Sequence, residues 1–281
     1  MQRFSNQMIL DGRKIADEIL LRIRERVDKE KLSLKLSVVL VGDNKVSLSY
    51  ISQKKESCIK AGVDFNLFQF NGDISQDDLK KEIEEINKKS SGVIIQLPLP
   101  SSLKSQEVLN MIPKEKDIDI LSEDRLGKYY AGDFYFLPPV VGAVAHVISK
   151  EKISIKDKYI VLVGSGKLVG KPLSIWLMAE GATISVLNKG TKDLESFIKK
   201  ADIIISGAGS SNLIKGEMIK DGVIAIDAGS SIEVSRVSGD FENKTVAKKA
   251  SLFLPVPGGI GPITTACLID NLIKLNELYG N

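Results

Sequence analysis

The chain has 281 residues, 43% of them hydrophobic and 27% charged, the composition of a globular protein of about two domains. Its 39 Lys and Arg against 36 Asp and Glu leave a net charge of +3, which predicts neither nucleic acid nor a membrane surface as a partner. One histidine, His146, excludes the common zinc sites, and Cys58 and Cys267 are too few for a disulfide framework. We expect a cytoplasmic protein, since the N-terminus is charged where a signal peptide is apolar and no run of about 18 apolar residues occurs.

The first half of the chain alternates helical and strand patterns. Apolar residues recur every four positions over 11–30, which predicts a helix. Further helices are predicted over 47–61, where Gly62 supplies a C-terminal cap, and over 76–89. Short strands are predicted over 36–41, 63–70 and 92–97. Strands that alternate with helices at this spacing predict a mainly parallel sheet.

A second series of elements follows Leu137-Pro138-Pro139. It comprises predicted strands over 159–163, 183–187, 203–206 and 223–227, a helix over 172–180 and a final helix over 264–278. We therefore predict two α/β domains, residues 1–136 and 137–263, with the C-terminal helix, 264–281, packing back on the first domain.

A glycine-rich loop, VGSGKLVGKP, joins the strand that ends at Val163 to the helix that begins near Pro172. Glycines there allow the backbone to approach a pyrophosphate, and the helix N-terminus offers unpaired N–H groups. The loop predicts a Rossmann-type dinucleotide-binding domain, although its spacing is one residue longer than the common fingerprint. A plain strand-to-helix turn is the alternative.

The end of the next strand bears on the choice of dinucleotide. NAD enzymes tend to place an acid there for the ribose 2′-hydroxyl, whereas NADP enzymes use positive charge. Here the sequence is Leu187-Asn188-Lys189, without an acid. The absence of an acid favours NADP, with NAD possible. Lys189 is either a ligand of the 2′-phosphate, as NADP binding requires, or a solvated lysine of the loop.

A candidate lysine site lies in the first half. Tyr50 and Lys54 are four residues apart in a predicted helix and share one face. Gln96 ends a predicted strand, where open α/β sheets bind ligands, and Asp119 follows in the loop KDID. A partly buried lysine near a glutamine has a lowered pKa and can transfer protons. By spacing alone, a core tyrosine and solvated charges remain the alternative.

The segment LPVPGGIGPIT, residues 254–264, combines three prolines with three glycines before the final helix. Such a segment predicts an unusual backbone path, against which a ligand can lie closely because glycine has no side chain. A tight loop without a ligand is the alternative.

Together these segments resemble the bifunctional methylenetetrahydrofolate dehydrogenase/cyclohydrolase family, from Ile9-Leu-Asp-Gly12 to the C-terminal helix. The matching stretches are Ser47-x-x-Tyr50-x-x-x-Lys54-x-x-x-Cys58, Gln96-Leu-Pro-Leu-Pro100, Lys116-Asp-Ile-Asp119, Gly239-Asp-Phe241 and Pro255-Val-Pro-Gly-Gly259.

The resemblance implies two reactions in a cleft between the domains: oxidation of 5,10-methylenetetrahydrofolate by NADP⁺ and hydrolysis of the methenyl product to 10-formyltetrahydrofolate. It implies that Lys54 is the general acid/base, that Gln96 tunes and positions it, that Tyr50 lies against the folate and that Asp119 holds the pterin edge. The other folate contacts implied are Ser47, Leu97, Pro98, Pro257, Gly258, Gly259 and Pro262. The dinucleotide contacts implied are Gly164, Ser165, Gly166, Val169, Gly170, Asn188, Lys189, Ala208, Gly209 and Ile232. A homodimer is implied as well.

The chain departs from the family pattern mainly around the nucleotide. Gly164-Ser165-Gly166 replaces Gly-Arg-Ser, so the arginine often used on the adenosine phosphate is missing, and Lys189 is a candidate to supply that charge. Ile120-Leu121 replaces Gly-Phe after Asp119. The alternatives are an NAD-linked dehydrogenase of another small substrate and a non-catalytic folate- or nucleotide-binding relative.

Overall fold

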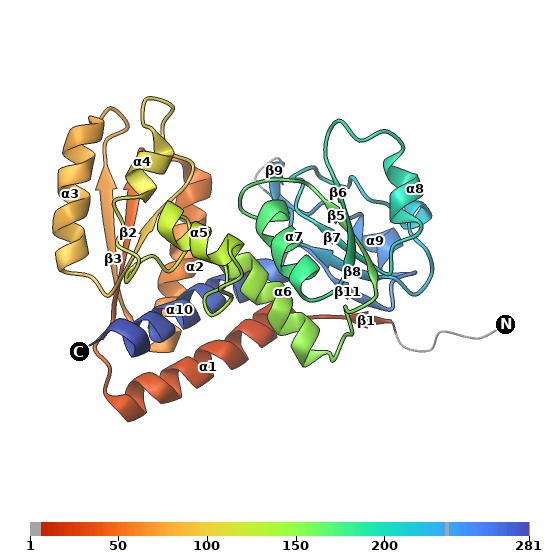
Figure 1. Cartoon of the computed structure of the whole chain (residues 1–281), viewed down its shortest axis with the longest axis horizontal. Coiled ribbons are helices and arrows are strands. Elements are labelled where there is room, and N and C mark those ends of the chain that lie inside the picture. The colour runs from red at the N-terminus through yellow and green to blue at the C-terminus, as the bar shows by residue number, and fades with distance from the viewer. Residues whose placement is uncertain (1–6, 234–235, 281) are drawn as a thin grey trace. The chain divides into compact units, whose positions relative to one another are not determined.

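The computed structural model describes residues 7–233 and 236–280, without the side chains of 232, 233 and 236 (Figure 1). The chain divides into two compact units. Unit 1 comprises Val140–Thr264 and a stretch that ends at Ile15, and unit 2 comprises Ala16–Pro139 and the stretch that begins at Thr265. The chain passes from one unit to the other within α1 (Gly12–Glu30), α6 (Pro139–Lys150) and α10 (Ile260–Tyr279).

Unit 2 is built on a three-stranded parallel sheet of β2 (Lys35–Val41), β3 (Asp64–Phe70) and β4 (Gly92–Ile95). Its spatial order is β3-β2-β4. The chain thus runs from β2 to β3 on one side of β2 and then crosses to β4 on the other side. The carboxyl ends of β2 and β4 therefore form a topological switch point, the place where open α/β sheets bind ligands. The remaining helices of this unit are α2 (Lys45–Ala61), α3 (Gln76–Lys88), α4 (Ser105–Leu109) and α5 (Glu123–Tyr130).

Strands β2 and β4 are buried on both faces, whereas β3 is only partly buried. Val39 and Val41 of β2 lie in one cluster with Leu79 and Ile83 of α3 and Val108 of α4. In Figure 1, α3 lies on one side of the strands and α2 on the other. The sequences of β2 and β4 are accordingly almost continuously apolar, as buried parallel strands require, whereas β3 mixes apolar with polar residues.

Unit 1 contains a six-stranded parallel sheet in the order β1-β11-β8-β7-β5-β6. The strands are β1 (Met8–Ile9), β5 (Tyr159–Val163), β6 (Thr183–Leu187), β7 (Ile203–Ser206), β8 (Ile224–Asp227) and β11 (Leu252–Leu254). The other elements are α7 (Gly170–Ala179), α8 (Leu194–Ile198), the 3₁₀ helix η1 (Gly216–Met218), α9 (Asn243–Val246) and the antiparallel pair β9 (Ser231–Glu233) and β10 (Arg236–Ser238). Strand β5 lies between β6 and β7, so the switch point of this sheet is at the carboxyl ends of β5 and β7.

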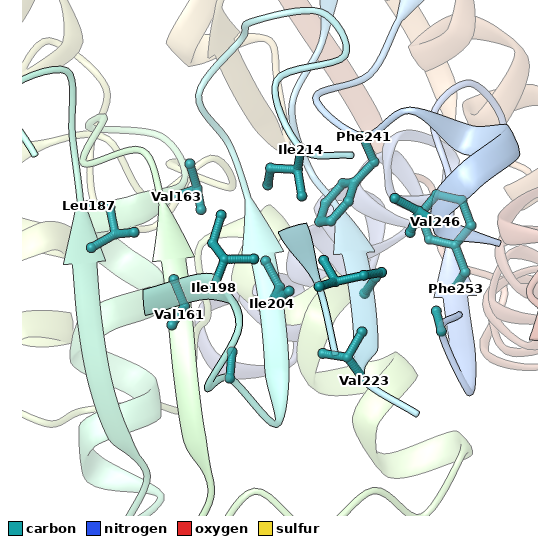
Figure 2. Close-up of a cluster of buried hydrophobic side chains, with 14 residues drawn as sticks. Val161, Val163, Leu187, Ile198, Ile204, Ile214, Val223, Phe241, Val246 and Phe253 are labelled. Atoms are coloured by element: carbon teal, nitrogen blue, oxygen red, sulfur yellow. The ribbon is translucent and has the colours of Figure 1, made fainter. Parts of the chain in front are cut away.

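Figure 2 shows the hydrophobic cluster on one face of these strands. Val161 and Ile204 project from β5 and β7, and Phe253 of β11 contacts Phe241 with ring centroids 5.8 Å apart. Phe241 lies beside the carboxyl ends of the strands in this view. The cluster therefore anchors the segment that contains Phe241 next to the ligand-binding edge of the sheet.

The mainly parallel α/β class predicted from the sequence is confirmed. The final helix begins at Ile260 rather than at 264, because Pro262 occupies its first turn, where a missing N–H leaves no bond unmade. Strands β1 and β11 were not predicted, since two- and three-residue strands carry too little periodicity. Within the part of the chain that the structure describes, no helix has the length and apolarity needed to cross a bilayer.

Candidate active site

Helix α2 places Ser47, Tyr50 and Lys54 on one face. The side chain of Asn44 caps its start by accepting the N–H groups of Val46 and Ser47 at 2.9 and 3.1 Å. Ser47 is buried and Tyr50 is half-buried. With spacings of three and four residues, the three side chains lie along the same stripe of the helix.

Lys54 and Gln96 form a direct hydrogen bond. The Nζ of Lys54 donates to Oε1 of Gln96 at 2.7 Å, and Nε2 of Gln96 donates to the carbonyl of Leu97 at 2.8 Å. Gln96 directly follows β4, where its own N–H bonds the carbonyl of Val39 in β2 at 2.8 Å. The two bonds of the amide side chain fix which of its ends faces the lysine, so the amide oxygen is presented to Nζ.

Asp119 lies on a rigid segment. On one side of it, the carbonyl of Ile118 accepts a hydrogen bond from Nδ2 of Asn271 at 2.9 Å. On the other side, Ile120 is fully buried. Ile120 has a φ of +57°, a conformation that a β-branched residue adopts only under local constraint. Asp117 supplies such a constraint, since its carboxylate accepts the N–H groups of Leu121 and Ser122 at 3.1 and 2.8 Å.

The electrostatics of this cluster suit proton transfer. Burial lowers the pKa of Lys54, an effect that the negative charge of Asp119 partly opposes. Burial also raises the pKa of Asp119 to about 6, against the opposing effect of Lys54. A lysine that loses its proton more readily than usual can act as a base near neutral pH.

Two residues that support the site were missed by the sequence analysis. Asp117 is 1% exposed and Asn271 is 3% exposed. Asn271 also donates to the carbonyl of Leu137 at 3.0 Å, so it joins two loops of unit 2 to α10. The available signal was an asparagine three residues after Leu268 and four before Leu275, on the apolar face of the helix, because a buried amide there requires hydrogen-bond partners.

The glycine loop of unit 1 depends on close backbone contacts. The N–H of Gly164 donates to the carbonyl of Leu187 at 2.8 Å, which ties the ends of β5 and β6 together. Gly164 has a φ of +106°, and a Cβ there would lie 2.6 Å from the carbonyl oxygen of Gly207. A Cβ on Gly170 would lie 1.9 Å from the carbonyl oxygen of Gly164. Only glycine fits at these two positions.

The same loop leaves room for a ligand beside these contacts. A Cβ on Gly166 would meet no described atom within 4 Å, and both Gly166 and Ser165 are at least partly exposed. Val169 is the N-cap residue of α7, and its side chain makes no capping hydrogen bond. The space beside Gly166 lies at the start of a ten-residue helix and at the switch point of the sheet. This is the kind of place where the pyrophosphate of a dinucleotide binds.

The other predicted dinucleotide contacts come after the carboxyl ends of β6, β7 and β8 in the chain. Asn188 and Lys189 are exposed directly after β6, in a turn where the N–H of Gly190 donates to Oδ1 of Asn188 at 2.9 Å. Ala208 and Gly209 follow β7. Ile232 lies in β9, and its side chain is outside the described residues.

The proline- and glycine-rich segment forms the start of α10. Gly258 has a φ of +91°, and its carbonyl accepts the N–H of Gly12 at 2.9 Å. Gly259 is buried, whereas Pro257 is exposed and Pro262 is half-buried. These predicted folate contacts lie in unit 1.

The structure thus brings Lys54 and Gln96 together and places Asp119 close enough to affect Lys54 electrostatically, all in unit 2. Leu97 and Pro98 continue the chain from Gln96. Cys58 is buried on α2, and burial raises its thiol pKa to about 12, which makes it a poor nucleophile.

Comparison with known proteins gives a consistent result. Residues 10–119 match the catalytic domain of the tetrahydrofolate dehydrogenase/cyclohydrolase family, and residues 138–279 match its NAD(P)-binding domain. The chain is 38% identical over 270 residues to the bifunctional protein FolD of Hydrogenobaculum sp., covering 95% of this chain and 97% of that protein.

Solved structures agree. The bifunctional FolD enzyme of Campylobacter jejuni superposes with a TM-score of 0.91 at 33% identity, over 96% of this chain and 99% of that one. The dehydrogenase-cyclohydrolase of Trypanosoma brucei, solved with NADP and an inhibitor, has a TM-score of 0.91 at 27% identity, over 96% and 97% of the two chains.

Proposed function

Since the chain belongs to the tetrahydrofolate dehydrogenase/cyclohydrolase family, we propose specific roles for its residues in the two reactions of that family. The protein oxidises 5,10-methylenetetrahydrofolate to the methenyl cation with NADP⁺, and it hydrolyses that cation to 10-formyltetrahydrofolate. The hydrogen bond between Lys54 and Gln96 is the observation that carries the assignment of roles.

Lys54 acts as the general acid/base of the hydrolysis. When neutral, its amine has one lone pair, and one N–H is occupied by Oε1 of Gln96 at 2.7 Å. The lone pair takes a proton from water as the water oxygen bonds to the methenyl carbon. Lys54 then gives this proton to the ring nitrogen as the bond from that nitrogen to the carbon breaks. The hydroxyl formed from the water loses its remaining proton to solvent as its oxygen becomes the carbonyl of the formyl group on the other nitrogen.

The cationic substrate itself promotes this role. A positive charge beside Lys54 disfavours the ammonium form and lowers the lysine pKa further. Gln96 accepts a hydrogen bond without contributing a negative charge, so it orients Nζ without stabilising the ammonium form as a carboxylate would. A glutamine is therefore a suitable partner for a lysine that must act as a base.

Asp119 and Tyr50 bind the folate. The carboxylate of Asp119 accepts hydrogen bonds from the N–H groups along the pterin edge, and the ring of Tyr50 lies against the folate. Ser47, Leu97 and Pro98 in unit 2, and Pro257, Gly258, Gly259 and Pro262 in unit 1, are proposed as further folate contacts.

The switch point of unit 1 holds the dinucleotide, which accepts a hydride when bound. We propose that Gly164, Ser165, Gly166, Val169 and Gly170 surround the pyrophosphate, with Asn188, Ala208, Gly209 and Ile232 along the rest of the cofactor. Lys189 pairs with the 2′-phosphate and supplies the charge that the missing arginine provides in relatives. We also propose that the protein acts in the cytoplasm and that it is a homodimer. Size-exclusion chromatography with light scattering tests the oligomeric state.

The experiment that tests these roles measures both reactions in one protein. Methenyl formation is followed spectrophotometrically with NADP⁺ and with NAD⁺, and hydrolysis is followed by loss of methenyltetrahydrofolate. We expect Lys54→Met to lower the rate of hydrolysis at least about a hundredfold, because general acid/base catalysis supplies a factor of this order.

Lys55→Met is the matched control. Lys55 is the exposed neighbour of Lys54 on α2, and its replacement leaves hydrolysis within about two-fold of the wild type, as surface substitutions usually do. Hydrolysis by Lys54→Met at the wild-type rate would contradict the role of Lys54.

A further inference from the structure

Unit 1 contains two fully buried carboxylates that the proposed roles do not use. Asp227 ends β8, and Asp240 precedes Phe241; both are 0% exposed. Burying a carboxylate is unfavourable unless hydrogen bonds compensate, so the donors around each of these groups indicate what it holds in place.

Asp240 holds the segment that follows β7. Its carboxylate accepts three hydrogen bonds: from the Oγ of Ser206 at 2.6 Å, from the N–H of Ala208 at 2.7 Å and from the N–H of Ser210 at 2.7 Å. The three donors lie within residues 206–210, the last residue of β7 and the four that follow it, which we name the β7 loop. Bonds of this length to a carboxylate are charge-assisted and stronger than neutral ones, so this one side chain holds the β7 loop at three points.

The β7 loop lies directly against the glycine loop. The N–H of Gly207 donates to the carbonyl of Val163 at 2.8 Å, and a Cβ on Gly164 would lie 2.9 Å from the nitrogen of Ala208. A Cβ on Gly207 would lie 2.3 Å from Cγ1 of Val169. Because the backbone at Gly164 and the side chain of Val169 both lie this close to the β7 loop, a shift of that loop must also displace the glycine loop.

Asp240 is itself firmly placed. The carboxylate of Asp227 accepts the N–H of Asp240 at 3.2 Å and that of Phe241 at 3.1 Å, and Phe241 is anchored in the hydrophobic cluster of Figure 2. Gly229 lies against the Asp240 carboxylate so closely that a Cβ there would be 2.1 Å from Cγ. The position of this carboxylate is therefore set by Asp227 at the end of β8, by Gly229 and by the packing of Phe241.

We infer that Asp240 is a positioning residue for dinucleotide binding, which fixes the β7 loop and, through it, the glycine loop at the switch point of unit 1. The inference rests on the proposed binding of the dinucleotide at that edge. Asp240 itself touches neither the substrate nor the reacting atoms in this role.

The test is Asp240→Asn, with dissociation constants for NADP⁺ measured by calorimetry alongside both enzymatic rates. An asparagine keeps the size of the side chain but turns an N–H group towards one of the donors of the β7 loop. We expect the NADP⁺ dissociation constant and its KM to rise roughly ten-fold, as expected when a buried hydrogen bond to a charged group is lost. The hydrolysis rate, which needs no dinucleotide, should stay within about two-fold, a split that general destabilisation would not produce.

Two further variants keep the test decisive. Ser206→Ala removes one donor, retains the carboxylate and both N–H bonds, and should raise the NADP⁺ dissociation constant by roughly two- to five-fold even if Asp240→Asn does not fold. Asp221→Asn makes the same chemical change at an exposed position of unit 1 and should alter neither reaction.

Unchanged NADP⁺ binding in Asp240→Asn and Ser206→Ala, or an equal loss of hydrolysis and binding, overturns the inference. Wild-type protein that binds neither dinucleotide contradicts the proposed function instead, so the two failures are distinguishable.

Discussion

The side-chain oxygen of Gln96 lies 2.7 Å from Nζ of Lys54, and the amide nitrogen of the same glutamine is held by the carbonyl of Leu97. The lysine therefore faces a neutral acceptor whose orientation is fixed by the backbone. Because burial lowers the pKa of Lys54 and Gln96 does not reverse this by adding charge, the pair is suited to a lysine base.

Replacing Gln96 by glutamate tests this pairing. A carboxylate beside Lys54 favours the ammonium form and raises the lysine pKa, so we expect hydrolysis at pH 7 to fall roughly ten-fold or more and to recover as the pH rises. The measurement is the pH profile of methenyltetrahydrofolate hydrolysis. Gln53→Glu, which adds the same charge at an exposed position of α2, should leave the profile unchanged. A Gln96→Glu profile identical to that of the wild type would exclude a role for Gln96 in setting the lysine pKa.

Asp119 predicts a pH dependence of folate binding. Its pKa of about 6 means that the carboxylate is charged above that pH and protonated below it. We expect wild-type kcat/KM for methylenetetrahydrofolate to decline as the pH falls through about 6, and Asp119→Asn to lower kcat/KM at pH 7.5 by roughly ten-fold or more. Asp124→Asn, at an exposed position of α5, is the control. If Asp119→Asn retained full kcat/KM at pH 7.5, the proposed contact with the pterin edge would be wrong.

Ile120 carries backbone strain next to Asp119. Both Ile118 and Ile120 are 0% exposed, but only Ile120 has a positive φ, which glycine adopts without penalty. Replacing either isoleucine by glycine removes a buried side chain, and at position 120 the change also relieves about 1–2 kcal/mol of strain. We therefore expect Ile120→Gly to destabilise the protein by about 1–2 kcal/mol less than Ile118→Gly in urea unfolding. Equal losses for the two variants would show that Ile120 is unstrained.

Lys189 should distinguish the two dinucleotides. An exposed lysine paired with a phosphate contributes modestly, so we expect Lys189→Ala to raise the KM for NADP⁺ roughly five-fold with little change for NAD⁺. Lys192→Ala, at another exposed position of the loop between β6 and α8, is the control. Equal changes for NADP⁺ and NAD⁺ in Lys189→Ala would rule out recognition of the 2′-phosphate by this lysine.

Local periodicity and residue chemistry were sufficient to predict much of this protein. The strands over 159–163, 183–187 and 203–206 are predicted with the bounds that the structure has, because each is a short run rich in apolar and β-branched residues between turn signals. The resemblance pointed to Lys54, Gln96 and Asp119 as the residues of one site. The hydrogen bond between Lys54 and Gln96, and its direction, required the structure.

Only the tertiary structure decided what holds these residues in place. Asn271 reaches the carbonyl of Ile118 across 153 positions of sequence, and Asp240 reaches the N–H of Ala208 across 32. Local patterns report which face of an element is apolar, but they carry no information about which distant backbone group a buried polar side chain meets. The sequence by itself therefore determined the class of fold and the chemistry available to the site, whereas tertiary packing decided which buried carboxylates and amides orient it, because those partners are set by the folded path of the chain.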